Sequence, residues 1–70
     1  MVLHFTSCSD AAASAIAAMA AGDVIVIDGH RVCPANDIPN LWLEAPDGEV
    51  CLFPGADEIV RHLNFNGVPS

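Results

Sequence analysis

A Pro-Asp-Gly turn between two β-prone segments constrains the fold of this chain more than any other feature. Residues 46–48 form the turn, and the flanking segments span residues 41–45 and 49–53. Proline presets φ at the first turn position and glycine adopts the left-handed conformation, which is the pattern of a type I turn closed by a bulge. The sequence therefore predicts a β-hairpin. In this register one face holds Leu41, Leu43, Cys51 and Phe53, and the other holds Trp42, Glu44, Val50 and Leu52.

A second hairpin is predicted earlier in the chain. Residues 24–27 are a β-branched run that ends at an Asp-Gly pair at residues 28–29, a strong signal for a two-residue hairpin turn. Residues 30–33 then supply a short return strand. Pro34 and Pro39 frame the connection to the next hairpin, which we expect to be irregular because proline cannot donate to a strand ladder.

Two helices are predicted outside the hairpins. The Ala-rich run of residues 11–21 consists of strong helix formers, and Gly22 supplies the residue that ends the helix. Residues 56–63 form a short amphipathic helix with carboxylates in its first turn and Arg and His in its last, which suits the helix dipole. Residues 2–5 are β-prone, and we expect the last residues of the chain to fray.

These elements predict one α+β domain over residues 1–70. Its core is an antiparallel sheet of about four or five strands built from the two hairpins. The Ala-rich N-terminal helix and the short C-terminal helix pack on this sheet. Hydrophobic residues make up 53% of the chain and charged residues 16%. This composition supports a compact fold without disulfides or metal.

The charge of the chain is strongly negative. The chain contains nine Asp and Glu residues, two Arg and no Lys, which gives a formal net charge of -7. Because a phosphate backbone is bound by several Lys and Arg side chains, we expect no direct nucleic acid binding and instead a basic protein surface as partner. Five of the nine carboxylates fall within fifteen residues and are candidates for that contact: Glu44, Asp47, Glu49, Asp57 and Glu58. The competing interpretation is that the acidity serves solubility alone.

Trp42 is the sixth candidate for partner binding. It lies on the hairpin face opposite the more apolar set, beside Val50 and Leu52. If one helix covers each face of the sheet, Trp42 is part of the core. If both helices share a face, Trp42 anchors an exposed apolar patch of the kind that marks interfaces.

The cysteine and histidine pattern argues against metal or thiol chemistry. The spacings His4-x3-Cys8 and His30-x2-Cys33 lack the paired Cys-x2-Cys pattern of zinc sites. No nucleophile elbow, phosphate loop or dinucleotide fingerprint is present, so we expect neither an enzyme nor a cofactor. Three unpaired cysteines without a recognisable secretion signal predict reduced thiols in a cytoplasm, with no membrane association.

The combination of small size, acidity and absent Lys resembles small phage-encoded anti-defence proteins, including the anti-CRISPR proteins. These proteins share no common fold, so the resemblance is one of class and transfers no residue role. It implies an inhibitor that docks on a basic, nucleic-acid-binding surface, such as that of a CRISPR effector in a bacterial cytoplasm, and blocks access of nucleic acid. The alternative is a structural or regulatory interaction module that uses the apolar face around Trp42. A monomer and a homodimer both fit these interpretations.

Overall fold

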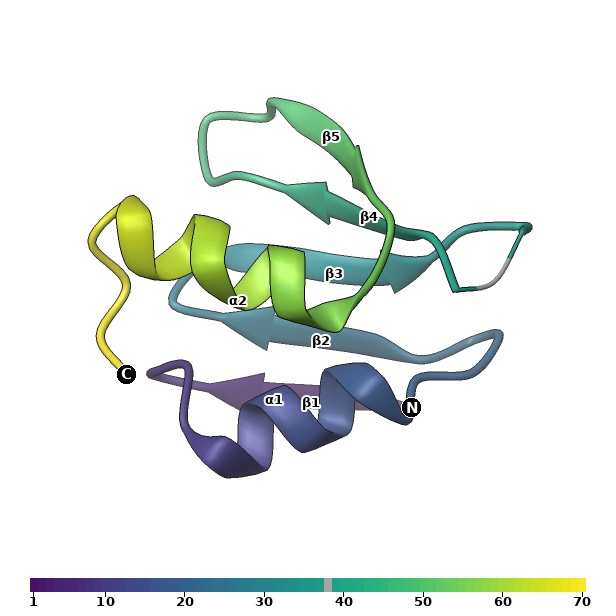
Figure 1. Ribbon diagram of the computed structural model, residues 1–70, viewed down its shortest axis with the longest axis horizontal. Coiled ribbons are helices and arrows are strands. Elements are labelled where there is room, and N and C mark those ends of the chain that lie inside the picture. Colours follow the sequence, from purple (N-terminus) through teal and green to yellow (C-terminus); the bar gives the residue numbers. More distant parts are fainter. Residues whose placement is uncertain (38) are drawn as a thin grey trace.

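A computed structural model describes residues 1–37 and 39–70 of the chain (Figure 1). That part of the chain contains five strands and two helices, in the order one strand, one helix, four strands and one helix. The elements are β1 (Val2–Phe5), α1 (Asp10–Ala17), β2 (Val24–Ile27), β3 (His30–Pro34), β4 (Leu41–Glu44), β5 (Val50–Phe53) and α2 (Ala56–Phe65). The α+β class predicted from the sequence is confirmed.

The five strands form one sheet in the order β1-β2-β3-β4-β5. β1 pairs with β2 in parallel, whereas each later pair of neighbours is antiparallel. The prediction of a purely antiparallel sheet is therefore wrong, and the sheet is mixed. The reason lies in α1, which returns the chain to the end of the sheet where β1 began, so that β2 must run in the same direction as β1 (Figure 1).

Both predicted hairpins are confirmed. In the first, Asp28 and Gly29 have φ values of 47° and 83°, the positive values that a two-residue turn between twisted strands requires. In the second, the Gly48 N–H donates to the Ala45 carbonyl at 2.9 Å, and Gly48 has a φ of 92°. The register is the predicted one, since Leu41 pairs with Phe53, Trp42 with Leu52, Leu43 with Cys51 and Glu44 with Val50.

Helix α1 ends four residues before the predicted boundary at Ala21. Its start is capped by Ser9, whose side chain accepts the Ala12 N–H at 3.2 Å. After the helix, the Asp23 carboxylate accepts the Ala20 N–H at 3.1 Å, and the Asp23 N–H donates to the Ala20 carbonyl at 3.0 Å. This local turn competes with helix continuation and leads the chain directly into β2.

Helix α2 is two residues longer than predicted, and the tail that follows it is ordered. The Val68 N–H donates to the Leu63 carbonyl at 3.0 Å and the Gly67 N–H to the Asn64 carbonyl at 3.2 Å, which together form a Schellman motif. The side chain of Val68 is buried, and the Pro69 carbonyl accepts the Cys8 N–H at 2.7 Å. The expectation of a frayed C-terminus is wrong, because these contacts fasten the tail to the core.

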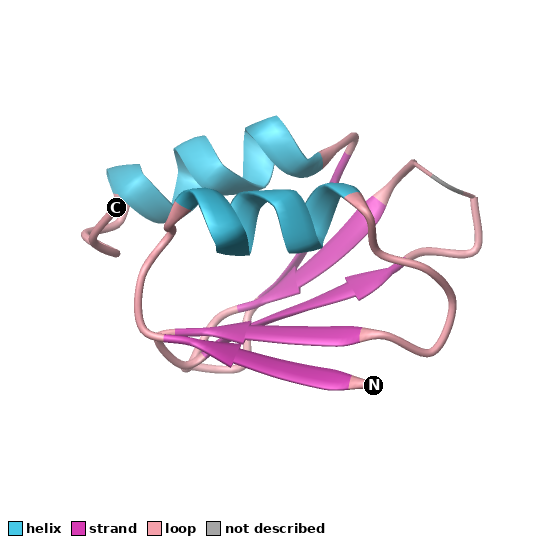
Figure 2. Ribbon diagram, turned by 90° about the horizontal axis from the view of Figure 1, so that it is seen from below, coloured by secondary structure: helices cyan, strands magenta, loops and turns pink. Residues whose placement is uncertain are grey.

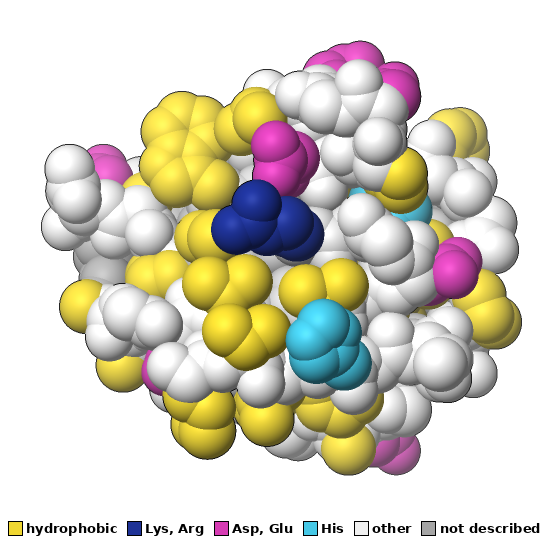
Figure 3. Space-filling model, turned by 180° about the vertical axis from the view of Figure 1, so that it is seen from behind, with side chains coloured by type: hydrophobic (Ala, Val, Ile, Leu, Met, Phe, Trp, Pro, Cys, Tyr) yellow, Lys and Arg dark blue, Asp and Glu magenta, His cyan; other side chains and the backbone are white. Residues whose placement is uncertain are grey.

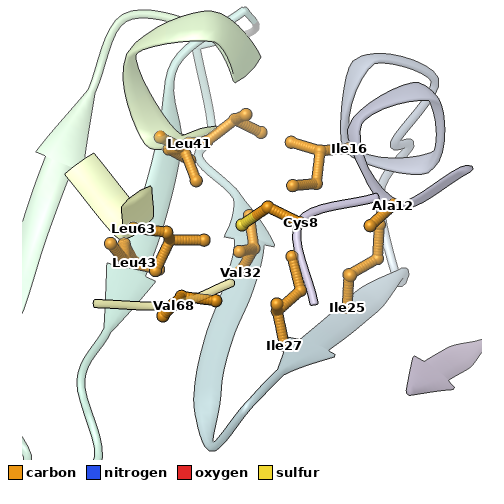
Figure 4. Packing of buried hydrophobic residues seen from close by; sticks show 11 residues of the cluster. Cys8, Ala12, Ile16, Ile25, Ile27, Val32, Leu41, Leu43, Leu63 and Val68 are labelled. Atoms are coloured by element: carbon orange, nitrogen blue, oxygen red, sulfur yellow. The ribbon is translucent and has the colours of Figure 1, made fainter. Parts of the chain in front are cut away.

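Both helices lie on the same face of the sheet (Figure 2). The core fills the space between the helices and that face, and Figure 4 shows side chains from both layers pointing toward one another. α1 contributes Ala12 and Ile16 to this core, and α2 contributes Ile59 and Leu63. The strands contribute Ile25, Ile27, Val32, Leu41 and Leu43, and the loops contribute Cys8 and Val68.

The two prolines noted in the sequence border the connection between β3 and β4. Pro34 is the last residue of β3 and pairs with Leu41, so the strand includes one residue more than predicted. The Ala35 N–H donates to the Asn40 carbonyl at 3.0 Å and closes the loop. Residue 38, which the prediction of an irregular connection included, lies outside the described residues.

The anchoring of the tail makes a prediction about stability. We expect Val68→Ala to lower the free energy of unfolding by about 2 kcal/mol, since it removes two methyl groups from a closely packed site. Phe65→Ala is the control, because Phe65 is 90% exposed and its loss should change the stability by less than about 0.5 kcal/mol. Urea unfolding of both variants measures these values. Equal midpoints for Val68→Ala and the parent chain would contradict the anchoring.

Candidate functional site

One face of the sheet is left uncovered by the helices and strands that the structure describes (Figures 2 and 3). Side chains alternate between the two faces of each strand, so the residues opposite the core point to this side. Strand pairing arranges them in two rows that cross the sheet from β1 to β5. We call this surface the open face, formed by an apolar row of Val2, Val24, Cys33, Trp42 and Leu52 and a mixed row of His4, Val26, Arg31, Glu44 and Val50.

The open face exposes large hydrophobic side chains close together. Trp42 is 43% exposed and Leu52, its partner across the β4–β5 pair, is 49% exposed. Val50 on the same strand is 51% exposed, and Val2 at the far edge of the sheet is 56% exposed. Both helices lie on the same face of the sheet (Figure 2). This is the arrangement for which Trp42 was expected to anchor an exposed apolar patch.

The dimensions of this surface suit a protein partner. The face lies across the two longer extents of the molecule, 28 and 24 Å, whereas the third extent is 19 Å. The total accessible surface is 4142 Å². A standard interface buries about 800 Å² per partner, roughly one fifth of that total. One broad face of this small molecule is therefore comparable in scale to a standard interface.

One ion pair lies within the open face. Arg31 on β3 is the register partner of Glu44 on β4, and the Arg31 Nη1 donates to the Glu44 Oε1 at 3.2 Å. The two side chains are 55% and 41% exposed, so water reaches both groups. Figure 3 shows basic and acidic side chains side by side among hydrophobic side chains on this face of the molecule.

The structure divides the five candidate carboxylates between two ends of the molecule. Glu44, Asp47 and Glu49 lie at the β4–β5 turn, where the Asp47 carboxylate accepts the Glu49 N–H at 3.0 Å. Asp57 and Glu58 lie in the first turn of α2, which the chain reaches only after β5 has run back to the opposite end of the sheet (Figure 1). The five residues therefore do not form one patch.

The sequence analysis missed Asp28 as a member of the acidic group at the turn end. Its turn lies beside the β4–β5 turn, since a Cβ added at Gly29 would lie 3.3 Å from the Cγ of Pro46. Asp28, Asp47 and Glu49 are exposed there. The order of the predicted strands already indicated this neighbourhood, because alternate turns of an antiparallel run of strands lie at the same end of the sheet.

Cys8 and His4 lie in different environments. Cys8 is 7% exposed in the core, and burial raises the pKa of its thiol. His4 is instead exposed on the open face. Among the described residues, no group of three or more His, Cys, Asp and Glu side chains is placed to hold a metal ion.

The open face combines exposed apolar side chains with an exposed ion pair. Comparison of the chain with protein-family models, with curated proteins and with solved structures gave no match. Across residues 1–37 and 39–70, no helix combines the length and the apolar character needed to cross a membrane. The functional argument therefore depends on the geometry and charge of the described residues.

The burial of Cys8 predicts an order of thiol reactivity. At mildly alkaline pH we expect Cys33 and Cys51, which are half-buried, to react with an aromatic disulfide reagent at least about tenfold faster than Cys8. Because burial raises the pKa of the Cys8 thiol, labelling of Cys8 in the native state should increase only at a pH above that at which a free thiol ionises. Labelling kinetics of Cys33→Ser and Cys51→Ser assign the phases. A Cys8 that reacts as fast as the others would contradict its burial.

Proposed function

We propose that this chain is a protein-binding module that docks through its open face on a basic surface of a larger protein. The observation that carries this proposal is the uncovered sheet face with Trp42 and Leu52 about half exposed. Burial of exposed apolar surface is the main driving force of most protein association. Tryptophan is also among the residues that most often dominate binding energy when they lie near the centre of an interface.

The charge around the open face favours a basic partner. Arg31, the basic side chain on this face, is already paired with Glu44, whereas Asp28, Asp47 and Glu49 are exposed at its turn end. The chain as a whole carries a formal net charge of -7. A surface with an apolar centre and Lys or Arg at its border would complement both features.

Nucleic-acid-binding proteins are the partner class that this chemistry favours. Their binding surfaces carry Lys and Arg side chains arranged to neutralise phosphates. A module docked on such a surface excludes nucleic acid from it, which is the action of an inhibitor of the anti-CRISPR kind. This form of the proposal requires the acidic turn end to contribute to affinity as well as the apolar row.

The second candidate is a structural or regulatory module that binds through the apolar row alone. It is favoured by the separation of Asp57 and Glu58 from the other candidate carboxylates, which leaves a smaller acidic group near the open face. Salt distinguishes the two candidates. Electrostatic docking weakens as ionic strength rises, whereas an apolar interface responds little.

The test compares two variants that each remove an exposed aromatic side chain, one on the open face and one on α2. Tagged wild-type chain and the variants Trp42→Ala and Phe65→Ala are used to capture proteins from a bacterial lysate, and the captured proteins are identified by mass spectrometry. We expect partners shared by wild type and Phe65→Ala to be lost with Trp42→Ala, with affinity for the purified partner falling at least about 30-fold. Phe65 is a suitable control because it is an exposed aromatic side chain on α2.

A second pair of variants tests the contribution of charge. Asp47→Lys/Glu49→Lys and Asp57→Lys/Glu58→Lys each replace two carboxylates by two ammonium groups and so change the net charge equally. We expect only the first pair to weaken binding, and DNA or RNA to compete with the wild-type chain for the partner. Equal binding by wild type and Trp42→Ala would contradict the proposed function. Binding that is lost with Trp42→Ala but insensitive to both charge pairs would support the regulatory module.

A further inference from the structure

We propose that Asn66 is a site of spontaneous deamidation, that the anchored C-terminal tail slows the reaction, and that the reaction releases this tail. The chain has four asparagines, and Asn66 is the one that is followed by glycine. Because glycine has no side chain, the backbone nitrogen of Gly67 can approach the Asn66 side chain closely. Both residues are exposed at the end of α2, so water reaches the site.

The reaction needs only the chain and water. The Gly67 nitrogen attacks the Asn66 Cγ and forms a new C–N bond, while the bond from Cγ to Nδ2 breaks. The proton of the Gly67 N–H leaves with the side-chain nitrogen as ammonia. Water then opens the cyclic imide at one of its two carbonyls. One opening leaves aspartate at position 66, and the other leaves isoaspartate, in which the backbone continues through the side chain and is longer by a methylene group.

The folded tail engages both reacting groups. The Gly67 N–H, which carries the nucleophile, donates to the Asn64 carbonyl at 3.2 Å. The Asn66 Nδ2, which is the leaving group, donates to the His62 carbonyl at 2.8 Å. The Schellman motif maintains these bonds while the tail is in place, and Val68, which is 4% exposed, holds the tail in the core. Attack therefore requires local opening of the tail, and the free energy of that opening sets the rate.

The products do not fit the end of the helix. A carboxylate at position 66 has no donor for the His62 carbonyl, and it places a negative charge at the negative end of the α2 dipole. In isoaspartate the longer backbone also shifts the N–H groups of Gly67 and Val68 away from the carbonyls that accept them. Modification therefore weakens the contacts that fasten the tail.

Peptide mapping by mass spectrometry during incubation at mildly alkaline pH tests the site and the effect of the tail. We expect Asn66 to deamidate at least about tenfold faster in the urea-unfolded chain than in the native chain. We also expect Val68→Ala to accelerate the native reaction at least about tenfold, because it favours opening of the tail.

The control for this measurement is Ile25→Ala. Figure 4 shows Ile25 beside Ala12 of α1 and apart from Val68. Ile25→Ala removes more buried side chain than Val68→Ala does and leaves the tail intact, so it should accelerate the native reaction far less.

Circular dichroism melts establish that the variants fold, and Val68→Thr or Ile25→Val replaces an alanine variant that does not. Absence of deamidation at Asn66 in the unfolded chain would overturn the site. Equal rates in the native and unfolded chains, or equal acceleration by the two variants, would overturn control of the reaction by the tail.

Labelling of Cys8 tests the release of the tail. The Cys8 N–H donates to the Pro69 carbonyl at 2.7 Å, and the Cys8 side chain lies in the buried cluster that Val68 completes. A loosened tail should therefore make this thiol more accessible. The measurement uses a chain in which serine replaces the other two cysteines, so that Cys8 is the thiol that reacts. In that background, we expect Asn66→Asp to raise the labelling rate at least about threefold over the matched control.

The matched control is Asn64→Asp in the same background. It adds the same charge to the last turn of α2, and a carboxylate there can still accept the Ser70 hydroxyl, as the Asn64 Oδ1 does at 3.1 Å. It leaves the hydrogen bond from Asn66 to the His62 carbonyl in place. Equal labelling rates of Cys8 in the two variants would overturn release of the tail by the modification.

Discussion

The packing of both helices against one face of the sheet is the constraint on which the rest of the structure depends. Ile16 of α1 and Ile59 and Leu63 of α2 are fully buried against the strands, with relative exposures of 0 to 1%. A domain of this size buries a smaller share of its surface than a larger one, and its largest fully buried side chains all belong to the one cluster between the helices and the sheet. The opposite face then has no covering element among the described residues, and every second strand residue there meets solvent.

The parts of the fold that depend on local chemistry could be predicted from the sequence. The Asp28-Gly29 turn and the Gly48 turn each require positive φ, and their residue types fixed both hairpins and the β4–β5 register. The parallel pairing of β1 with β2 depends on where α1 crosses the sheet, which no turn residue specifies. The ordered C-terminus likewise depends on a distant contact, between the Cys8 N–H and the Pro69 carbonyl.

The same division explains how much of the candidate site the sequence contained. Strand alternation placed Trp42 with Glu44, Val50 and Leu52, but which face the helices cover is a tertiary property. For the carboxylates, closeness in the sequence did not correspond to closeness in the structure. Asp57 follows Glu49 closely in sequence, yet β5 separates them along the sheet, whereas Asp28 is distant in sequence and its turn lies beside that of Pro46. Sequence proximity is therefore a poor guide to the acidic surface.

Under the proposed function, solubility and partner selection, the two explanations of the acidity, apply to different parts of the molecule. Electrostatic interactions in solution are screened over about 8 Å at physiological ionic strength. The molecule is 19 Å deep along its shortest axis. A carboxylate in the first turn of α2, such as Asp57, lies on the helix layer, and the proposal gives it a role chiefly against nonspecific association. The carboxylates at the border of the open face, Asp28, Asp47 and Glu49, lie where a docked surface would come within the screening length, and the proposal gives them the role of selecting its charge.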